Sequence, residues 1–271
     1  MIFILRLIIA VGISVVVTAC NGGDSGNTEN TYTSDAKTSV NTPARSVFGA
    51  EVYGFDSDKV LYGKFIIRMK MVSKPGVISS FFLYDNDSWA GGIPWREIDI
   101  ESIGKSKDFL QTNIITGTSD SQIQSENTFK INDIESFHEY TLIWTPNEVT
   151  WLVDGVQIHQ ELAANSQQVR DLINTPQTYR MNIWVSKSVA WAGEFNLNSL
   201  PLQQEVDWIE YHQYDQSTQN FALSWRDDFD SNFLDTNRWG TANWTFEQNA
   251  STFRTSNVSV EDGKLILRLT E

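Results

Sequence analysis

The chain has 271 residues, of which 41% are hydrophobic and 12% aromatic, and it contains ten tryptophans. Such a composition can bury a sizeable core, so a disordered chain is excluded. The 34 acidic residues outnumber the 20 basic ones and give a net charge of -14, which repels a phosphate backbone and excludes nucleic acid as a partner. The single cysteine excludes an intrachain disulfide, a cysteine-based zinc site and an iron–sulfur cluster.

The chain opens with a basic residue and an apolar run, which together predict an export signal over residues 1–20. Arg6 is followed by almost wholly apolar residues from Leu7 to Val17, and the segment ends in Ala19 and Cys20. This end resembles a bacterial lipobox, in which Cys20 carries the lipid. The alternative is an uncleaved transmembrane anchor, since the run is near the lower limit of about 18 residues for crossing a bilayer. Both alternatives predict an exported domain in the cell envelope or at the cell surface of a bacterium, with the membrane contacted only through the N-terminal anchor.

Residues 21–45 are rich in Asn, Gly, Ser, Thr and Asp and have hardly any large apolar residue, which is typical of a flexible linker. Residues 46–271 are therefore predicted to form one folded domain, which we expect to be monomeric. A separate module over residues 215–271 is the alternative, but so short a segment without a disulfide has a marginal core.

Runs that are rich in β-branched and aromatic residues, several of them alternating apolar with polar, follow one another along this domain, separated by Gly, Pro, Asn or Asp. They predict strands at residues 61–71, 77–84, 97–101, 109–115, 140–144, 149–153, 156–158, 180–185, 206–211 and 264–270. Asp154 and Gly155 between two of these runs predict a hairpin turn. One short helix is expected within residues 163–173. Many strands and few helices predict an all-β sandwich. The tryptophans in or near these runs are expected to be buried in it: Trp144, Trp151, Trp208 and Trp225.

The residues that carry chemistry are concentrated between Glu97 and Glu101. Side chains at alternate positions of a strand share a face, so Glu97, Asp99 and Glu101 project together while Ile98 and Ile100 point into the core. The outer Cα atoms are roughly 13 Å apart at ~3.3 Å per residue. Two long glutamates that lean toward each other can shorten this to the ~5–5.5 Å carboxyl spacing of a retaining glycosidase. One carboxylate then attacks the anomeric carbon and the other, protonated, donates to the leaving oxygen, while Asp99 raises a neighbour's pKa or shares a proton with it.

A solvated acidic face or a calcium site is the alternative for this cluster. Calcium ligands usually lie in loops, whereas the β-branched Ile98 and Ile100 keep this segment a regular strand. Like charges without interleaved cations also destabilise a sheet, so a purely structural role is unattractive. The pattern therefore favours catalysis.

The sequence Glu97-Ile98-Asp99-Ile100-Glu101 resembles the E-x-D-x-E signature of glycoside hydrolase family 16. It has the form without an extra bulge residue that is typical of the family's 1,3-1,4-β-glucanases, or lichenases. The surrounding segments agree with this resemblance at residues 49–53, 62–65, 68–70, 79–84, 113–117 and 137–140. The resemblance covers about residues 46–271 and implies a jelly-roll, concanavalin A-like sandwich.

The order of the segments is similar to that of the naturally circularly permuted members of the family. The segment from Trp225 to Asp230, followed by Trp239, Trp244 and residues 263–267, resembles what usually opens the catalytic domain, and here it closes the chain. Because sandwich termini often lie close together at the surface, such a permutation is physically permissible.

The resemblance also implies roles for individual residues: Glu97 as nucleophile, Glu101 as general acid/base and Asp99 as the assisting carboxylate. Aromatic faces stack on the apolar face of a pyranose, while amide and guanidinium groups bind its hydroxyls. The implied substrate-binding residues are Phe82, Tyr84, Asn86, Trp95, Gln111, Asn113, Arg180, Asn182, Trp184, Trp191 and Trp244. No cofactor is expected for catalysis. The family often carries a structural calcium ion, and the positions that match its ligands are Asp207, Asp228 and Gly263.

The sequence therefore predicts an endo-acting, retaining glycoside hydrolase whose partner is a β-glucan polysaccharide with mixed 1,3-1,4 linkages. An endo-1,3-β-glucanase acting on laminarin is the alternative among enzymes, and the missing bulge residue argues against it. A non-catalytic glycan-binding surface lipoprotein is the alternative from another class, but a binding protein has no need of three aligned carboxylates. Arg96 and the loop at residues 85–92 differ from the family's pattern beside the expected cleft.

Overall fold

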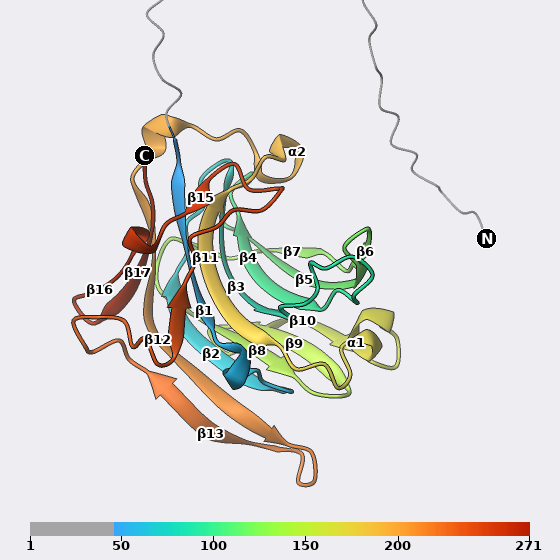
Figure 1. Cartoon of the computed structure of the whole chain (residues 1–271). Helices are drawn as coiled ribbons and strands as arrows, with labels where there is room; N and C mark the ends of the chain where they lie inside the picture. Colours follow the sequence, from blue (N-terminus) through green and yellow to red (C-terminus); the bar gives the residue numbers. More distant parts are fainter. Residues whose placement is uncertain (1–45) are drawn as a thin grey trace, which may run out of the picture. The chain divides into compact units, whose positions relative to one another are not determined.

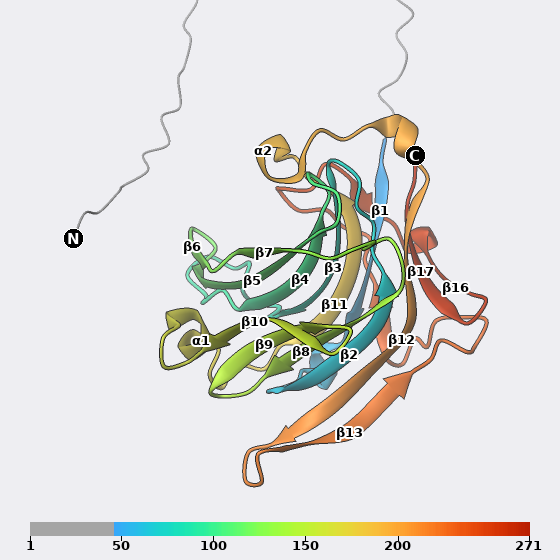
Figure 2. The same cartoon turned by 180° about the vertical axis from the view of Figure 1, so that it is seen from behind.

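A computed structural model describes residues 46–271, and these form two large β-sheets packed face to face (Figures 1 and 2). The predicted all-β sandwich is confirmed. The export signal predicted at residues 1–20, the linker at residues 21–45 and the lipid site at Cys20 lie outside the described residues and stay predictions.

The first sheet carries the predicted acidic strand near its middle. Its strands are hydrogen-bonded in the order β14-β1-β11-β3-β4-β5-β6, with β15 paired to β1 and β7 paired to β5. The bounds are β1 Phe48–Gly54, β3 Val77–Tyr84, β4 Glu97–Ile103, β5 Phe109–Thr118, β6 Ser121–Gln124, β7 Asn127–Lys130, β11 Thr178–Val185, β14 Trp239–Thr241 and β15 Thr252–Phe253.

The second sheet covers the other side of the core. Its order is β10-β9-β8-β2-β12-β17-β16, with β13 paired to β12. The bounds are β2 Gly63–Lys70, β8 His138–Trp144, β9 Glu148–Val153, β10 Val156–Leu162, β12 Leu202–Asp215, β13 Asn220–Asp227, β16 Val258–Glu261 and β17 Lys264–Leu269.

Helical structure is confined to short segments between strands. They are α1 Gln167–Asp171, α2 Val189–Ala192, η1 Asp56–Asp58, η2 Leu197–Ser199 and η3 Thr255–Asn257. The helix expected within residues 163–173 is therefore confirmed in a shorter form, and it begins where the Ser166 hydroxyl accepts a hydrogen bond from the backbone N–H of Val169. Within residues 46–271, no helix is long and apolar enough to cross a membrane.

Period-two alternation positions the core between the sheets. Every second residue of β2 is buried, and Phe65 of this strand packs against Phe81 of β3 and Tyr179 of β11, with ring centroids 5.2 and 5.5 Å apart. The predicted hairpin between β9 and β10 is also confirmed. Asp154 and Gly155 both have positive φ values, 51° and 75°, as a two-residue turn of this kind requires.

The prediction of four buried tryptophans is half correct. Trp144 and Trp151 are each 1% exposed, whereas Trp208 and Trp225 are only partly buried. A register shift in β12 between Val206 and Trp208 interrupts the alternation, so that Trp208 is not on the buried side and lies under the Arg226 guanidinium at 4.2 Å. The prediction for Trp208 was wrong because this bulge is not encoded in the apolar pattern.

The C-terminal segment belongs to the same sandwich as the rest. β14 and β15 pair with β1, and β17 pairs with β12, which excludes the alternative of a separate module at residues 215–271. Phe48 and Thr270 exchange two backbone hydrogen bonds of 2.8 and 2.9 Å, so the first and last strands meet (Figure 1). The permuted order relative to other members of the family stays a prediction, and the juxtaposed ends are what it requires.

A circular permutant, in which the present ends are joined and new ends are opened elsewhere, tests this arrangement. We expect a variant that joins Glu271 to Ser46 through a short Gly/Ser linker, and opens the β12–β13 turn between Gln216 and Ser217, to fold to the same sandwich, because Phe48 and Thr270 already lie side by side. Its far-UV circular dichroism and cooperative thermal unfolding are expected to match those of residues 46–271. A control opened inside β12, between Trp208 and Ile209, is expected not to fold, and equal behaviour of the two variants would contradict the prediction.

Candidate active site

Strand β4 presents three carboxylates on one face and two isoleucines on the other. Ile98 and Ile100 are 0% and 1% exposed in the core, which fixes the opposite orientation for Glu97, Asp99 and Glu101. The ladders from β4 to β3 and to β5 run without a register shift. The three acids therefore lie in one row on a regular central strand.

Polar and aromatic residues of the neighbouring strands lie beside this row of acids. On β3, Tyr84 is paired with Glu97 and Phe82 with Asp99. On β5, Asn113 is paired with Asp99 and Gln111 with Glu101. Further residues of this surface come from β11 and β1, where the paired residues are Phe82 with Arg180, Ser80 with Asn182, and Asn182 with Glu51.

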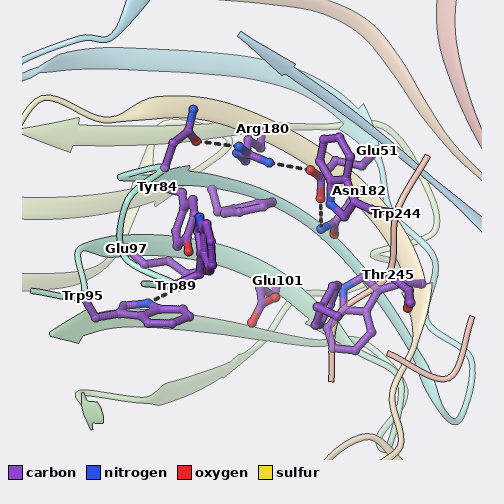
Figure 3. Close-up of a pocket in the computed structure, with 14 residues that line it drawn as sticks. Glu51, Tyr84, Trp89, Trp95, Glu97, Glu101, Arg180, Asn182, Trp244 and Thr245 are labelled. Carbon is purple, nitrogen blue, oxygen red and sulfur yellow. Dashed lines mark hydrogen bonds and ion pairs between the residues drawn. The ribbon is translucent and has the colours of Figure 1, made fainter. Parts of the chain in front are cut away.

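Trp95 is bonded to the first of the three acids. Its indole N–H donates to Oε2 of Glu97 at 2.6 Å, as Figure 3 shows, and its ring meets that of Tyr84 edge-on at 5.6 Å. Asp99 lies two residues further along the same face of β4. Glu97 is thus held at one end of the cleft by a fixed donor.

A buried ion pair forms the opposite wall. Arg180 donates to Oε1 of Glu51 at 2.6 Å and to Oδ1 of Asn86 at 2.5 Å (Figure 3). Asn182 donates to Oε2 of Glu51 at 3.1 Å and accepts a hydrogen bond of 2.6 Å from the Ser80 hydroxyl. Because Glu51 is only 3% exposed, the pair orients the guanidinium and amide groups that face the cleft.

Burial raises the pKa of Glu97 from 4.5 to about 7, although the hydrogen bond from Trp95 and the charge of Arg180 lower it in part. Burial also raises the pKa of Glu101 to about 8, and the negative charges of Glu97 and Glu126 add to this effect. The two glutamates therefore differ in environment, since Glu97 has a donor and a cation beside it.

Asp99 lies between the two glutamates and is 2% exposed. Burial holds its pKa well above 3.8, and the charges of Glu97 and Glu101 raise it further. Burial and mutual repulsion therefore both favour the protonated form of the carboxyl groups in this row.

Trp151 fixes the acidic strand from the second sheet. This residue of β9 is buried, and its indole N–H donates to the backbone carbonyl of Asp99 at 3.0 Å. Its ring stacks on His159 of β10 at 5.2 Å. The backbone beneath the carboxylates is thus tied to both layers of the sandwich.

The side chains enclose a cleft of about 610 Å³. The residues that line it are Glu51, Phe82, Tyr84, Asn86, Trp89, Trp95, Glu97, Glu101, Arg180, Asn182, Trp184, Trp244, Thr245 and Phe246. Aromatic rings stand at both ends, with Tyr84 and Trp95 beside Glu97 and Trp244 at the far end (Figure 3). Such a cleft accommodates several units of a sugar chain.

The predicted substrate-binding residues are mostly brought together. Those that line the cleft are Phe82, Tyr84, Asn86, Trp95, Arg180, Asn182, Trp184 and Trp244. Gln111, Asn113 and Trp191 do not. Gln111 and Asn113 are buried beside the acids, with the Asn113 amide oxygen accepting from the backbone N–H of Ser125, and Trp191 packs behind Trp184 at 6.1 Å. Contact of these three residues with substrate stays a prediction.

Four lining residues were not predicted: Glu51, Trp89, Thr245 and Phe246. For Glu51 a signal existed, since it is an acid in an alternating run and shares a face with Tyr53. The other three lie in segments without strand periodicity, at residues 85–93 and 242–249, where no pattern indicates orientation.

The predicted calcium ligands are engaged in other interactions. Oδ2 of Asp207 accepts from Arg68 at 3.0 Å, and Oδ1 of Asp228 accepts from Arg226 at 2.7 Å. Gly263 occupies a turn with φ of 69°. In the part of the chain that the structure describes, no group of three or more His, Cys, Asp or Glu side chains could hold a metal ion. Calcium at these three positions stays a prediction.

A β-sandwich with paired carboxylates in a cleft lined by aromatic and amide side chains defines a glycoside hydrolase. Comparison with known proteins gives the family. Residues 21–210 match the model described as glycosyl hydrolases family 16, and the chain belongs to this family.

Relatives of known name support the assignment. A beta-glucanase from Fibrobacter succinogenes is 40% identical over 242 residues, which are 87% of this chain and 67% of that protein. A beta-glucanase from Brevibacillus brevis is 33% identical over 152 residues, or 55% of each chain. The chain thus spans about half to two thirds of their length. The laminarinase catalytic domain from Thermotoga maritima MSB8, at 18% identity and a TM-score of 0.50 over 62% of this chain and 78% of that one, shares the fold.

The raised pKa of Glu97 predicts that its removal stabilises the protein at alkaline pH. A group whose folded pKa is raised contributes stability that is full below pH 4.5 and is lost as the pH rises through about 7. We expect Glu97→Gln to be more stable than wild type at pH 8 by about 3 kcal/mol, and equally stable near pH 4, in urea unfolding at both pH values. The matched control is Glu194→Gln, an exposed carboxyl group away from the cleft, which is expected to unfold like wild type. Destabilisation of Glu97→Gln at pH 8 would contradict the prediction.

Proposed function

We propose that the chain is an endo-acting, retaining glycoside hydrolase that cleaves 1,3-1,4-β-glucan through a covalent glycosyl-enzyme. The observation that carries the proposal is the pair of half-buried glutamates, Glu97 and Glu101, that line the aromatic cleft on either side of the buried Asp99. The hydrogen bond from Trp95 and the charge of Arg180 favour the ionised form of Glu97, whereas the charges of Glu97 and Glu126 favour the protonated form of Glu101. This difference suits a nucleophile and a general acid.

The steps follow from these roles. Glu97 attacks the anomeric carbon while the glycosidic bond breaks and the Glu101 proton passes to the leaving oxygen. Water then gives a proton to Glu101 and attacks the same carbon, which releases Glu97 and the sugar with its configuration retained. Asp99, next to Glu97 on the same face of β4, has its pKa raised by the charges of Glu97 and Glu101 and assists as Glu97 changes its charge state. Arg180 and Asn182 bind hydroxyl groups of the bound sugars.

The mixed-linkage preference is supported by two observations. The β4 ladders have no bulge, as in the E-x-D-x-E form that the sequence resembles, and the named relatives are beta-glucanases. Laminarin is the competing substrate. Export, the lipid at Cys20 and a stabilising calcium ion at Asp207, Asp228 and Gly263 complete the proposal as features expected from the sequence.

Product analysis on four polymers tests the substrate. We expect oligosaccharides from barley β-glucan and lichenan, and none from laminarin or carboxymethyl-cellulose, when each is incubated with the protein and the products are separated by chromatography. Cleavage of laminarin would support the 1,3-glucanase alternative. Binding of a polymer without products from any of them would support the glycan-binding alternative.

Substitution of each glutamate tests the mechanism. We expect Glu97→Ala to lose hydrolysis by at least about 10³-fold while it stays folded, because no covalent intermediate forms. With azide and an aryl glycoside, the same variant is expected to give a glycosyl azide of inverted configuration. Glu101→Ala is expected to retain hydrolysis of aryl glycosides, whose leaving group needs no proton, and to lose hydrolysis of the polymer. Equal losses of Glu101→Ala on both kinds of substrate would exclude Glu101 as the acid.

A further inference from the structure

Trp89 lies in the loop between β3 and β4 and lines the cleft, yet it belongs to none of the interactions described so far. Its side chain is 72% exposed. Among the described residues it forms no aromatic pair, whereas Trp95 is bonded to Glu97 and packed edge-on against Tyr84. One face of a large indole is therefore open to the cleft and to solvent.

The loop that carries Trp89 is held in place by its own hydrogen bonds. Ser88 is fully buried, and its hydroxyl accepts from the backbone N–H of Arg96 at 3.0 Å and donates to the carbonyl of Pro94 at 3.2 Å. The backbone of Ser88 is bonded to Asp85 at 2.9 Å. The residue before Trp89 is thus anchored to the chain that enters β4, so the backbone that carries the indole is fixed before a ligand binds.

The position of Trp89 separates it from the aromatic residues at the far end. Figure 3 shows Trp89 beside Tyr84 at the end of the cleft that holds Glu97, and Trp244 at the opposite end. A sugar chain bound across the carboxylates meets an aromatic face at each end.

We propose that Trp89 forms an outer sugar-binding subsite, in which its exposed indole face stacks on one glucosyl unit at the Glu97 end of the cleft. The open apolar face matches the CH face of a β-linked pyranose, and Asn86 and Arg180 of the same cleft supply polar groups for its hydroxyls. This subsite sets the length of oligosaccharide that the enzyme binds well. The inference rests on the proposed glucan substrate.

The test compares Trp89→Ala, Trp89→Phe and wild type on mixed-linkage oligosaccharides of increasing length. Loss of one stacking contact predicts a fall in kcat/KM of about 2- to 10-fold for Trp89→Ala, carried mainly by KM. The fall is expected on the polymer and on oligosaccharides long enough to reach the subsite, and not on the shortest substrates. Trp89→Phe is expected to keep most of the activity because a ring remains.

The matched control is Phe233→Ala, since Phe233 is 73% exposed and does not line the cleft. This variant is expected to behave like wild type on every substrate. An equal loss for Trp89→Ala at all lengths, or no loss at any length, would overturn the subsite.

Affinity electrophoresis in lichenan separates this inference from the proposed function, because it measures binding without turnover. Weaker retardation of Trp89→Ala than of Phe233→Ala supports the subsite even if wild type releases no products. Normal retardation of Trp89→Ala contradicts it, and so does the absence of retardation for wild type.

Discussion

Repulsion among three carboxylates on one face of β4 is the constraint on which the rest of the site depends. The strand cannot twist away to separate the charges, because β3 and β5 pair with it on both sides and Trp151 holds the Asp99 carbonyl from the other sheet. The repulsion is relieved chemically instead, since the pKa values rise and protons stay bound. Because the sandwich is rigid, burial and the repulsion between the carboxylates raise their pKa values toward neutral pH, where they can exchange protons.

The fixed cation of the cleft completes this balance. Arg180 is held by Glu51 and Asn86, so it lowers the pKa of Glu97 without forming a direct pair that would block the carboxylate. Trp95 also favours the ionised form of Glu97, because its neutral indole N–H donates a hydrogen bond to Oε2 of this residue. Two polar neighbours therefore favour the ionised form of Glu97 relative to Glu101, and the chemical difference between the two glutamates arises from their surroundings and not from the strand that carries them. Sites of this kind are commonly less stable than a neutral replacement.

Much of the fold and of the site was predictable from the sequence, because both depend on period-two patterns. Alternation gave strand β3 with its observed bounds and placed Glu97, Asp99 and Glu101 on one face. The bulge in β12 that reorients Trp208 was not predictable, since it depends on pairing with β2. Trp89, Thr245 and Phe246 reach the cleft from irregular segments, whose course is decided by contacts distant in sequence such as the anchoring of Ser88. Local patterns thus predict the floor of the cleft, and tertiary contacts decide its rims.

The pairing of the first strand with late strands has a consequence for the biosynthesis of the domain. β1 has its partners in β11, β14 and β15, and its first residues bond to Thr270. During translation, β1 cannot form any of these ladders until Thr178–Val185 has been synthesised. The sandwich is complete only when the last residues have been synthesised. Contacts so distant in sequence form slowly, because the loop entropy is lost before the contacts compensate it. The first strand of the sandwich therefore lacks ladder partners until residue 185 has been made, whereas ladders between strands adjacent in sequence, such as β3–β4 and β8–β9, can form earlier.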